Sequence, residues 1–440
     1  MLRTYRYRLY PSRSQEQNLW RVLDACRGLY NLALAERKYA YQLEGRSVSK
    51  AELYELAKRY RRTFPYANQM FSQTAQSVIE QVDLAFQAFF RRVKAGEKPG
   101  YPRFKGRGRY NSFLFKQFGF GARLDGRRLK LYGIGRVRVR WHRPLEGTVK
   151  TVRIQHKAGR WYACFTCEIP EPEPLPETGR AVGLDVGIAA LLTTSAGQKV
   201  GHPAFYRAGQ RRLRVLQRKL ARARRGSRNR HKVLRAVQRQ QEHVANQRKD
   251  FLHKLSTELV RRYDRIALED LRVTNMVRNH HLSKSILDSG WATFRQYLTY
   301  KAESAGREVA FVAPAYTSRC CSECGAVFQD FDLSTRWVIC ACGLSLDRDH
   351  NAARNILRRA GWDTPVPDNV APLLAASRGQ QGQASVRSPR LLAWGVSHTH
   401  YGQRRRRRSR RARDYPIVSD GCAAGDSAIT LPRDTTTRGG

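Results

Sequence analysis

The chain has 440 residues, room for two or three domains, and 41% of them are hydrophobic, so wholesale disorder is excluded. The formal net charge is +46, and so many positive side chains repel one another in the folded state unless a polyanion neutralises them. Nucleic acid is the predicted partner, with an anionic membrane as the competing reading. The sequence shows no apolar run near the ~20 residues of a spanning helix and no secretory signal. We therefore expect a cytoplasmic, nucleoid-associated protein.

The first third of the chain predicts a small β-barrel interrupted by helices. Residues 1–10 alternate basic and apolar side chains, as a strand does, and Pro11 and Ser12 end the pattern. Short alternating runs separated by turn residues fill 128–169 and predict an antiparallel sheet that the first strand joins. Helical spacing of apolar residues covers 14–45, 50–61 and 68–94.

A Pro- and Glu-rich stretch, PEPEPLPET at 170–178, predicts a linker between two domains. The run VGLDVGIAALLTTSAG that follows reads as a strand, a tight turn and a second strand. Residues 207–262 predict long helices with a narrow apolar stripe on a basic surface that includes Arg218 and Arg225, which suits a duplex backbone. The last 80 residues hold 13 Arg, six Asp, no Lys and no Glu, and we expect them to be disordered.

Three separate segments place a carboxylate at the edge of an apolar element. Asp185 lies within VGLDVGI, Glu269 follows the strand Ile266–Leu268, and Asp349 stands before a helix. Clustered carboxylates are the oxygen ligands that Mg²⁺ prefers, and two such ions about 4 Å apart can clamp the attacking and leaving oxygens of a phosphodiester.

Each acid also has an ordinary interpretation. Asp185 could cap the turn before Gly187, Asp270 could be the relevant acid in place of Glu269, and Asp349 could be the N-cap of a helix starting near Asn351.

Five of the nine cysteines fall within 23 residues. Cys321 and Cys324 form one pair, and Cys340 and Cys342 form a second pair that is one residue short of the usual spacing. Four thiolates suit a tetrahedral, structural Zn²⁺ site with no open position for catalysis. Cys320 could substitute for one of them, and four reduced, unliganded cysteines are the alternative.

Two stretches mix basic and aromatic residues and predict contacts with nucleic acid through charge and stacking. For both, an ordinary structural role remains open: a basic loop for one and alternating strand burial for the other. The predicted contact residues in these stretches are Arg103, Phe104, Lys105 and Arg107, and Tyr5, Tyr7 and Arg8.

The order of motifs along the chain resembles the TnpB (OrfB) family of bacterial insertion sequences, relatives of the type V CRISPR nucleases. The resemblance covers about residues 1–360, and its most specific part is the pairing of YTSRCCSECG (316–325) with LDRDHNAARNIL (346–357). The other matches are RLYPS (8–12), RGLYN (27–31), KPGYPRFK (98–105), VGLDVGI (182–188), RKDFLHKLS (248–256), IALEDLRVTNM (266–276) and GWATFRQYLTYKAESAG (290–306).

The resemblance implies an α/β, RNase H-like (RuvC) nuclease domain with an inserted zinc ribbon, preceded by a wedge-like β-barrel that carries a helical recognition lobe. It implies that Asp185, Glu269 and Asp349 hold Mg²⁺, with Asp349 chosen over Asp347. It also implies a guide noncoding RNA and a double-stranded DNA target next to a short flanking motif, in a ribonucleoprotein with one protein chain. The expected domains are 1–12 with 97–170 (barrel), 13–96 (helical lobe), 171–180 (linker), 181–317 with 345–360 (nuclease), 318–344 (zinc ribbon) and 361–440 (basic tail).

Three other functions compete with an RNA-guided endonuclease. One is a nuclease-dead, RNA-guided repressor, which the presence of all three acids disfavours. Another is a guide-independent transposase, although no second transposase site is visible in the sequence. The third is a structure-specific junction resolvase, which the large basic body and the cysteine cluster disfavour.

Overall fold

The structure is a computed structural model that describes residues 1–329, 331–332, 334–362 and 373. The chain divides into two compact units, Met1–Ser385 and Val386–Gly440, and the second unit lies outside the described residues. The predicted basic tail therefore also lies outside them, except for residues 361, 362 and 373. Among the helices that the structure describes, none is both long and apolar enough to cross a membrane.

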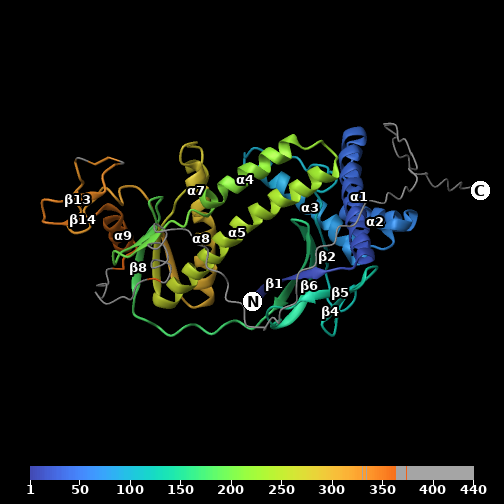
Figure 1. The fold of residues 1–440 in the computed structure, drawn as a ribbon, viewed down its shortest axis with the longest axis horizontal. Helices are drawn as coiled ribbons and strands as arrows, with labels where there is room; N and C mark the ends of the chain where they lie inside the picture. Colours follow the sequence, from blue (N-terminus) through green and yellow to red (C-terminus); the bar gives the residue numbers. More distant parts are fainter. Residues whose placement is uncertain (330, 333, 363–372, 374–440) are drawn as a thin grey trace, which may run out of the picture. The chain divides into compact units, whose positions relative to one another are not determined.

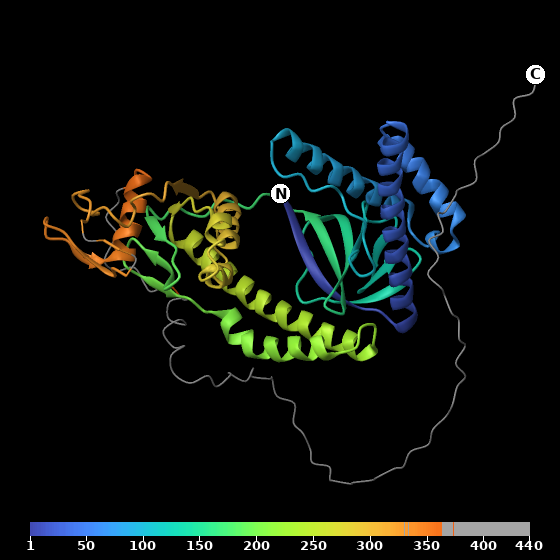
Figure 2. The same ribbon diagram turned by 90° about the horizontal axis from the view of Figure 1, so that it is seen from above.

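A seven-stranded antiparallel sheet, curled on itself, is built from the N-terminal strand and six later ones (Figure 2). Strand β1 (Leu2–Tyr10) lies inside the sheet, between β7 and β5, and alternation along it buries Tyr5, Tyr7 and Leu9. The strand order is β2-β6-β7-β1-β5-β4-β3. The remaining strands are β2 (Ser112–Phe115), β3 (Ala122–Asp125), β4 (Arg128–Leu131), β5 (Gly135–Arg140), β6 (Thr148–Lys157) and β7 (Arg160–Glu168).

Three α-helices stand between β1 and β2 in the chain and share one hydrophobic core with the curled sheet (Figure 1). Ser12 and Ser49 each begin a helix with a capping box, and Gly45 ends the first helix in the left-handed conformation. The helices are α1 (Arg13–Glu44), α2 (Lys50–Thr63) and α3 (Ser72–Lys94), with the 3₁₀ turn η1 (Pro65–Ala67).

A second sheet of five strands follows the Pro- and Glu-rich stretch, in the order β10-β9-β8-β11-β12. Strands β8, β11 and β12 run parallel to one another, whereas β9 and β10 are antiparallel. Parallel strands covered on both faces read as continuous apolar runs, as VGL and IAL do here. The strands are β8 (Ala181–Asp185), β9 (Ala190–Thr194), β10 (Lys199–Gly201), β11 (Arg265–Glu269) and β12 (Glu308–Val312).

Helices cover both faces of this second sheet. Val182, Leu184, Ile266 and Leu268 join a core with α5, α7 and α8, whereas the alternate residues of the same strands join a core with α9. The long basic helices α4 and α5 lie antiparallel, side by side (Figures 1 and 2). These helices are α4 (Phe205–Arg222), α5 (Arg228–Arg262), α6 (Val273–Met276), α7 (Ser283–Ser289), α8 (Trp291–Ser304) and α9 (Arg348–Arg359).

A two-stranded antiparallel hairpin, β13 (Trp337–Ile339) and β14 (Ser345–Asp347), leads directly into α9. This hairpin carries the second cysteine pair in its turn, so the cysteine-rich segment is an insertion between β12 and α9.

Candidate nuclease centre and nucleic-acid interface

The strand register brings two of the three predicted acids to one edge of the second sheet. Leu184 of β8 pairs with Leu268 of the parallel strand β11, and Asp185 and Glu269 are the next residues along. Adjacent strands lie about 4.8 Å apart, and alternation points both carboxylates to the face that α9 covers. Asp185 and Glu269 are therefore neighbours on one face, at the carboxyl ends of their strands.

Helix α9 supplies the third acid from its first turn. Gly183 of β8 faces this helix, and a Cβ atom there would lie only 2.0 Å from the carbonyl oxygen of Ala353. Asp349 stands four residues before Ala353, one turn along the same helix face. The glycine thus permits the close approach that brings Asp349 toward Asp185.

The N-cap of α9 is Asp347, so the interpretation of Asp349 as the cap of a helix starting near Asn351 is wrong. The Asp347 carboxylate accepts hydrogen bonds from the backbone N–H groups of Asp349 and His350, at 3.1 and 3.2 Å, and also pairs with Lys199. Capping occupies Asp347, whereas the carboxylate of Asp349 pairs with Arg348 at 3.4 Å.

The electrostatics of this edge are those of buried carboxylates that lie near one another. Burial, together with the nearby negative charges of Glu269 and Asp349, raises the pKa of Asp185 to about 8. Burial also raises the pKa of Glu269, against the opposing effects of the Thr317 hydroxyl and the Arg359 guanidinium. A cation at this edge would relieve both the desolvation and the repulsion, and hard carboxylate oxygens are the ligands that Mg²⁺ prefers.

The three carboxylates are not gathered as tightly as the ligands of one metal ion. Within the part of the chain that the structure describes, four cysteines form the sole group of three or more His, Cys, Asp or Glu side chains close enough for that. Like charges on Asp185, Glu269 and Asp349 oppose a closer approach.

The four predicted zinc ligands do meet, with all of their sulfur atoms within 4.8 Å of one another. Cys321 lies 3.6 Å from Cys342, and Cys324 lies 3.5 Å from Cys340, so the short second pair still reaches the group. Cys320 stays outside it. Four sulfur donors at this separation fit tetrahedral Zn²⁺.

Sequence reasoning missed the polar residues that join the cysteine segment to the acidic edge. Asn351 and Asn355 of α9 are buried, and both donate hydrogen bonds to the carbonyl oxygen of Cys320, at 2.8 and 2.7 Å. Asn355 also donates to the carbonyl oxygen of Thr317, whose hydroxyl donates to the Glu269 carboxylate. The signal was present in the sequence, because all three residues stand inside the motifs YTSRCCSECG and DRDHNAARN.

The predicted nucleic-acid contacts in β1 divide between core and surface. Tyr5 and Tyr7 are 1% and 0% exposed, and their hydroxyls bond Glu146 and the carbonyl oxygens of Arg143 and Pro144. Strand burial, the alternative interpretation, therefore describes both rings, which are not available for stacking on a base. Arg8 is half-buried and lies over the ring of Tyr10 at 4.5 Å.

The other predicted contacts lie on the surface. Arg103, Phe104 and Arg107 are exposed, whereas Lys105 is half-buried and its backbone exchanges two hydrogen bonds with the side chain of Asn31. Arg218 on α4 and Arg225 in the turn before α5 are exposed.

The outer face of the curled sheet carries cations that face one another across strands. Arg123 of β3 pairs in register with Lys130 of β4, which pairs with Arg136 of β5, and all three are exposed. Like charges directly opposite destabilise a sheet unless an anion screens them, as Asp125 does for Arg136 at 2.6 Å. The ladder of cross-strand cation pairs is completed by Arg128 with Arg138, and Arg8 with Arg140.

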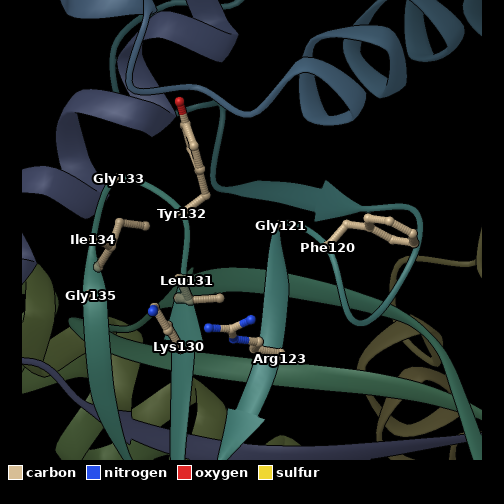
Figure 3. A pocket seen from close by; sticks show the side chains of 9 residues that line it. All are labelled: Phe120, Gly121, Arg123, Lys130, Leu131, Tyr132, Gly133, Ile134 and Gly135. Atoms are coloured by element: carbon tan, nitrogen blue, oxygen red, sulfur yellow. The ribbon is translucent and has the colours of Figure 1, made fainter.

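A cavity of about 460 Å³ opens at one end of this ladder (Figure 3). Figure 3 shows Arg123 and Lys130 side by side on neighbouring strands, with the exposed rings of Phe120 and Tyr132 at its rim. Sequence reasoning missed this cavity because its residues come together only when three strands pair.

Comparison with known proteins agrees with the motif order. Family models match residues 164–280 ("probable transposase"), 291–356 ("Cas12f1-like, TNB domain") and 1–46 ("helix-turn-helix domain"). A putative RNA-guided DNA endonuclease of Streptomyces pristinaespiralis is 34% identical over 403 residues, covering 90% of this chain and 98% of that protein. The chain belongs to the TnpB (OrfB) family.

A second relative and a solved structure extend the likeness. A putative RNA-guided DNA endonuclease of Escherichia coli is 31% identical, covering 81% of this chain and 92% of that protein. The Cas12f1 chain of a complex with guide RNA and target DNA has a similar fold, with a TM-score of 0.52 at 14% identity, covering 81% of this chain and 98% of that one. The helix-turn-helix description of residues 1–46 does not fit the fold, where this segment is strand β1 followed by the single helix α1.

Proposed function

We propose that this chain is an RNA-guided DNA endonuclease of an insertion sequence that cuts double-stranded target DNA beside a short flanking motif by Mg²⁺-dependent hydrolysis. The observation that carries the proposal is the convergence of Asp185, Glu269 and Asp349 on one face of the five-stranded sheet, where burial raises the pKa of both Asp185 and Glu269. The second sheet and α9 would be a RuvC-like nuclease domain, and the curled sheet would be the wedge. The names of the two relatives described above support the reaction class.

Mg²⁺ bound by the three carboxylates would supply a Lewis acid for the phosphoryl oxygen and an activated water at neutral pH. The chain's own residues set the geometry of that site. Thr317 orients the Glu269 carboxylate, and Arg348 lies beside Asp349. Gly183 allows α9 to lie against β8, so that a carboxylate from a distant segment reaches the other two.

The partners of the proposed activity are a guide noncoding RNA and double-stranded DNA, bound by one protein chain. The support is the charge distribution: residues 1–360 carry +39 of the +46, and the curled sheet opposes cations to cations across its strands. Phosphates would neutralise these pairs and release counterions on binding. The four-cysteine group would hold a structural Zn²⁺ that keeps the segment after β12 folded against α9 through Asn351 and Asn355.

The deciding experiment uses the purified full-length protein. Bound RNA is sequenced, and a plasmid library with the matching target beside a randomised flank is incubated with Mg²⁺ or with chelator. We expect double-strand breaks only with Mg²⁺ and only beside one flanking motif.

Asp185→Ala separates cutting from binding. It should abolish cleavage and leave binding of guide and target largely intact, whereas Asp250→Ala, at an exposed acid paired with Lys254, should cut normally. Full-rate cutting by Asp185→Ala would refute the assignment. Guided binding without cutting by the unaltered protein would favour an RNA-guided repressor, and cutting without RNA would favour a transposase or resolvase.

A further inference from the structure

A separate cavity of about 300 Å³ lies beside the acidic edge, bordered by the end of β11, by α6 and by α8. Glu269 is one of its wall residues, but the cavity lies on the α8 face of the sheet whereas the carboxylates point to the α9 face, so the cavity meets the proposed cutting site across the edge where β11 ends. Most of the remaining wall is apolar or aromatic, from Leu271, Trp291, Phe294 and Phe311. The cavity is at the small end of the range for ligand pockets, which suits one flat heterocycle.

The wall holds one buried polar group with nothing to bond. Trp291 is 5% exposed, and its indole Nε1–H has no hydrogen-bond partner within the described part of the chain. A buried donor without an acceptor costs folding free energy, and exceptions to pairing are rare in native proteins. The Nε1 atom is itself shielded from solvent, so Trp291 contributes its ring, and not this donor, to the surface that an occupant would meet.

Two arginines also line the cavity and give it a cationic margin. Arg295 lies 3.8 Å over the ring of Phe311 and pairs with Asp270. Arg272 is exposed, and no ion pair is found for it within residues 1–329. An occupant with an apolar, aromatic body and an attached negative charge would match both the wall and the margin.

We infer that this cavity receives one unstacked nucleobase of the strand being cut, with its phosphate toward Arg272 and Arg295 and the neighbouring phosphate toward Glu269. This inference rests on the proposed function and deepens it, because it assigns a nucleotide subsite to the same centre. Every nucleobase has a π-face, so the cavity selects for the presence of a base and not for its identity. Holding that base positions the adjacent phosphodiester for attack.

The test is an abasic scan with the full-length protein loaded with guide RNA. Target DNA carries one abasic residue, moved one nucleotide at a time across the mapped cut position, with every phosphate retained. Single-turnover cleavage should slow about tenfold at one position, or two adjacent ones, next to the cut. Changing the identity of the base at that position should have little effect.

Ala292→Phe tests the location. Ala292 lines the cavity from an exposed position on α8, so the larger side chain fills the cavity without entering the core. This variant should cut intact DNA about as slowly as the unaltered protein cuts the abasic target, and it should lose its sensitivity to the abasic residue. Thr299→Phe, at an exposed position two turns further along the same helix and not among the residues that line the cavity, should behave as the unaltered protein does.

The possible failures are distinguishable. A flat abasic scan with normal cutting overturns the nucleobase subsite and leaves the endonuclease in place. A flat scan together with slow cutting by Ala292→Phe also overturns it and indicates an occupant other than a base, such as a segment of protein. Absence of cutting of every unmodified target, with Mg²⁺ and guide present, overturns the proposed function itself, and the subsite with it.

Discussion

Replacing Gly183 by alanine should separate DNA binding from DNA cutting. The new Cβ atom would lie 2.0 Å from the Ala353 carbonyl oxygen, 2.8 Å from the Leu357 nitrogen and 3.0 Å from the Leu357 Cβ. Ordinary contacts begin at 3.4 Å, so α9 must move from β8 by about 1.4 Å at the closest point (3.4 minus 2.0). The obstacle is helix backbone on one side and strand on the other, and neither can rotate away as a side chain can.

Asp349 moves with α9, whereas Asp185 and Glu269 remain on the sheet. A displacement of about 1 Å in a catalytic group can cost about 100-fold in rate, so we expect single-turnover cleavage to fall by about that factor or more. Overpacking should also destabilise the nuclease part by about 1–3 kcal/mol. Guide and target binding, which depends on the basic surfaces, should change little.

The assay compares cleavage with guide and target binding for the same preparation, after a thermal melt shows that the variant is folded. Gly100→Ala is the control: its Cβ atom would lie 3.1 Å from Nη1 of Arg92, the flexible end of a long side chain, far in sequence from the acidic edge. It should cut at the unaltered rate. Cutting by folded Gly183→Ala within threefold of the unaltered protein would show that the approach of α9 to β8 does not set the geometry.

Three further outcomes are expected. Because the pKa of Asp185 is raised in the folded state, the protein in chelator should lose stability as pH rises from about 4 to about 8. Asp185→Asn should remove this dependence on pH and raise the Tm at pH 8 by at least about 2–4 °C. Equal curves of Tm against pH for the two proteins would contradict this. Metal analysis should find about one zinc per chain, retained in Cys320→Ser and lost in Cys342→Ser, and retention in both would place the metal elsewhere. For nucleic-acid binding, Arg138→Gln should reduce the slope of the log binding constant against log salt concentration by about 0.9. Arg46→Gln should change that slope little, because the Arg46 guanidinium already pairs with Glu44 and Glu52. An unchanged slope in Arg138→Gln would show that the curled sheet does not contact phosphates.

Much of the secondary structure follows from local patterns. The predicted helix at 14–45 is α1 (Arg13–Glu44), because Ser12 with Gln15 forms a capping box and Gly45 supplies the left-handed end. The continuous apolar runs predicted β8 and β11, and the acidic residue that ends each run was evident from the sequence. The cysteine spacing indicated a metal site whose four sulfur atoms do meet.

The local sequence pattern did not determine which side chains of β1 point into the core. The sequence left Tyr5 and Tyr7 open between stacking on nucleic acid and burial, because an alternating strand has two faces and only the strands on either side decide which one is inside. The ladder of cross-strand cation pairs was hidden for the same reason. Arg123, Lys130 and Arg136 become neighbours only through the register of β3, β4 and β5.

The sequence by itself determined which acids and cysteines the chain carries, the elements that bear them and the family to which it belongs. Only the tertiary structure decided that Asp185 and Glu269 point to the face covered by α9, that Asp347 caps this helix and leaves Asp349 within its first turn, and that Thr317 reaches Glu269. The physical reason is the distance along the sequence over which each interaction acts. Caps and periodicity act within a few residues, whereas the approach of α9 to Gly183 joins segments about 170 residues apart (353 minus 183), and no local preference encodes such a contact.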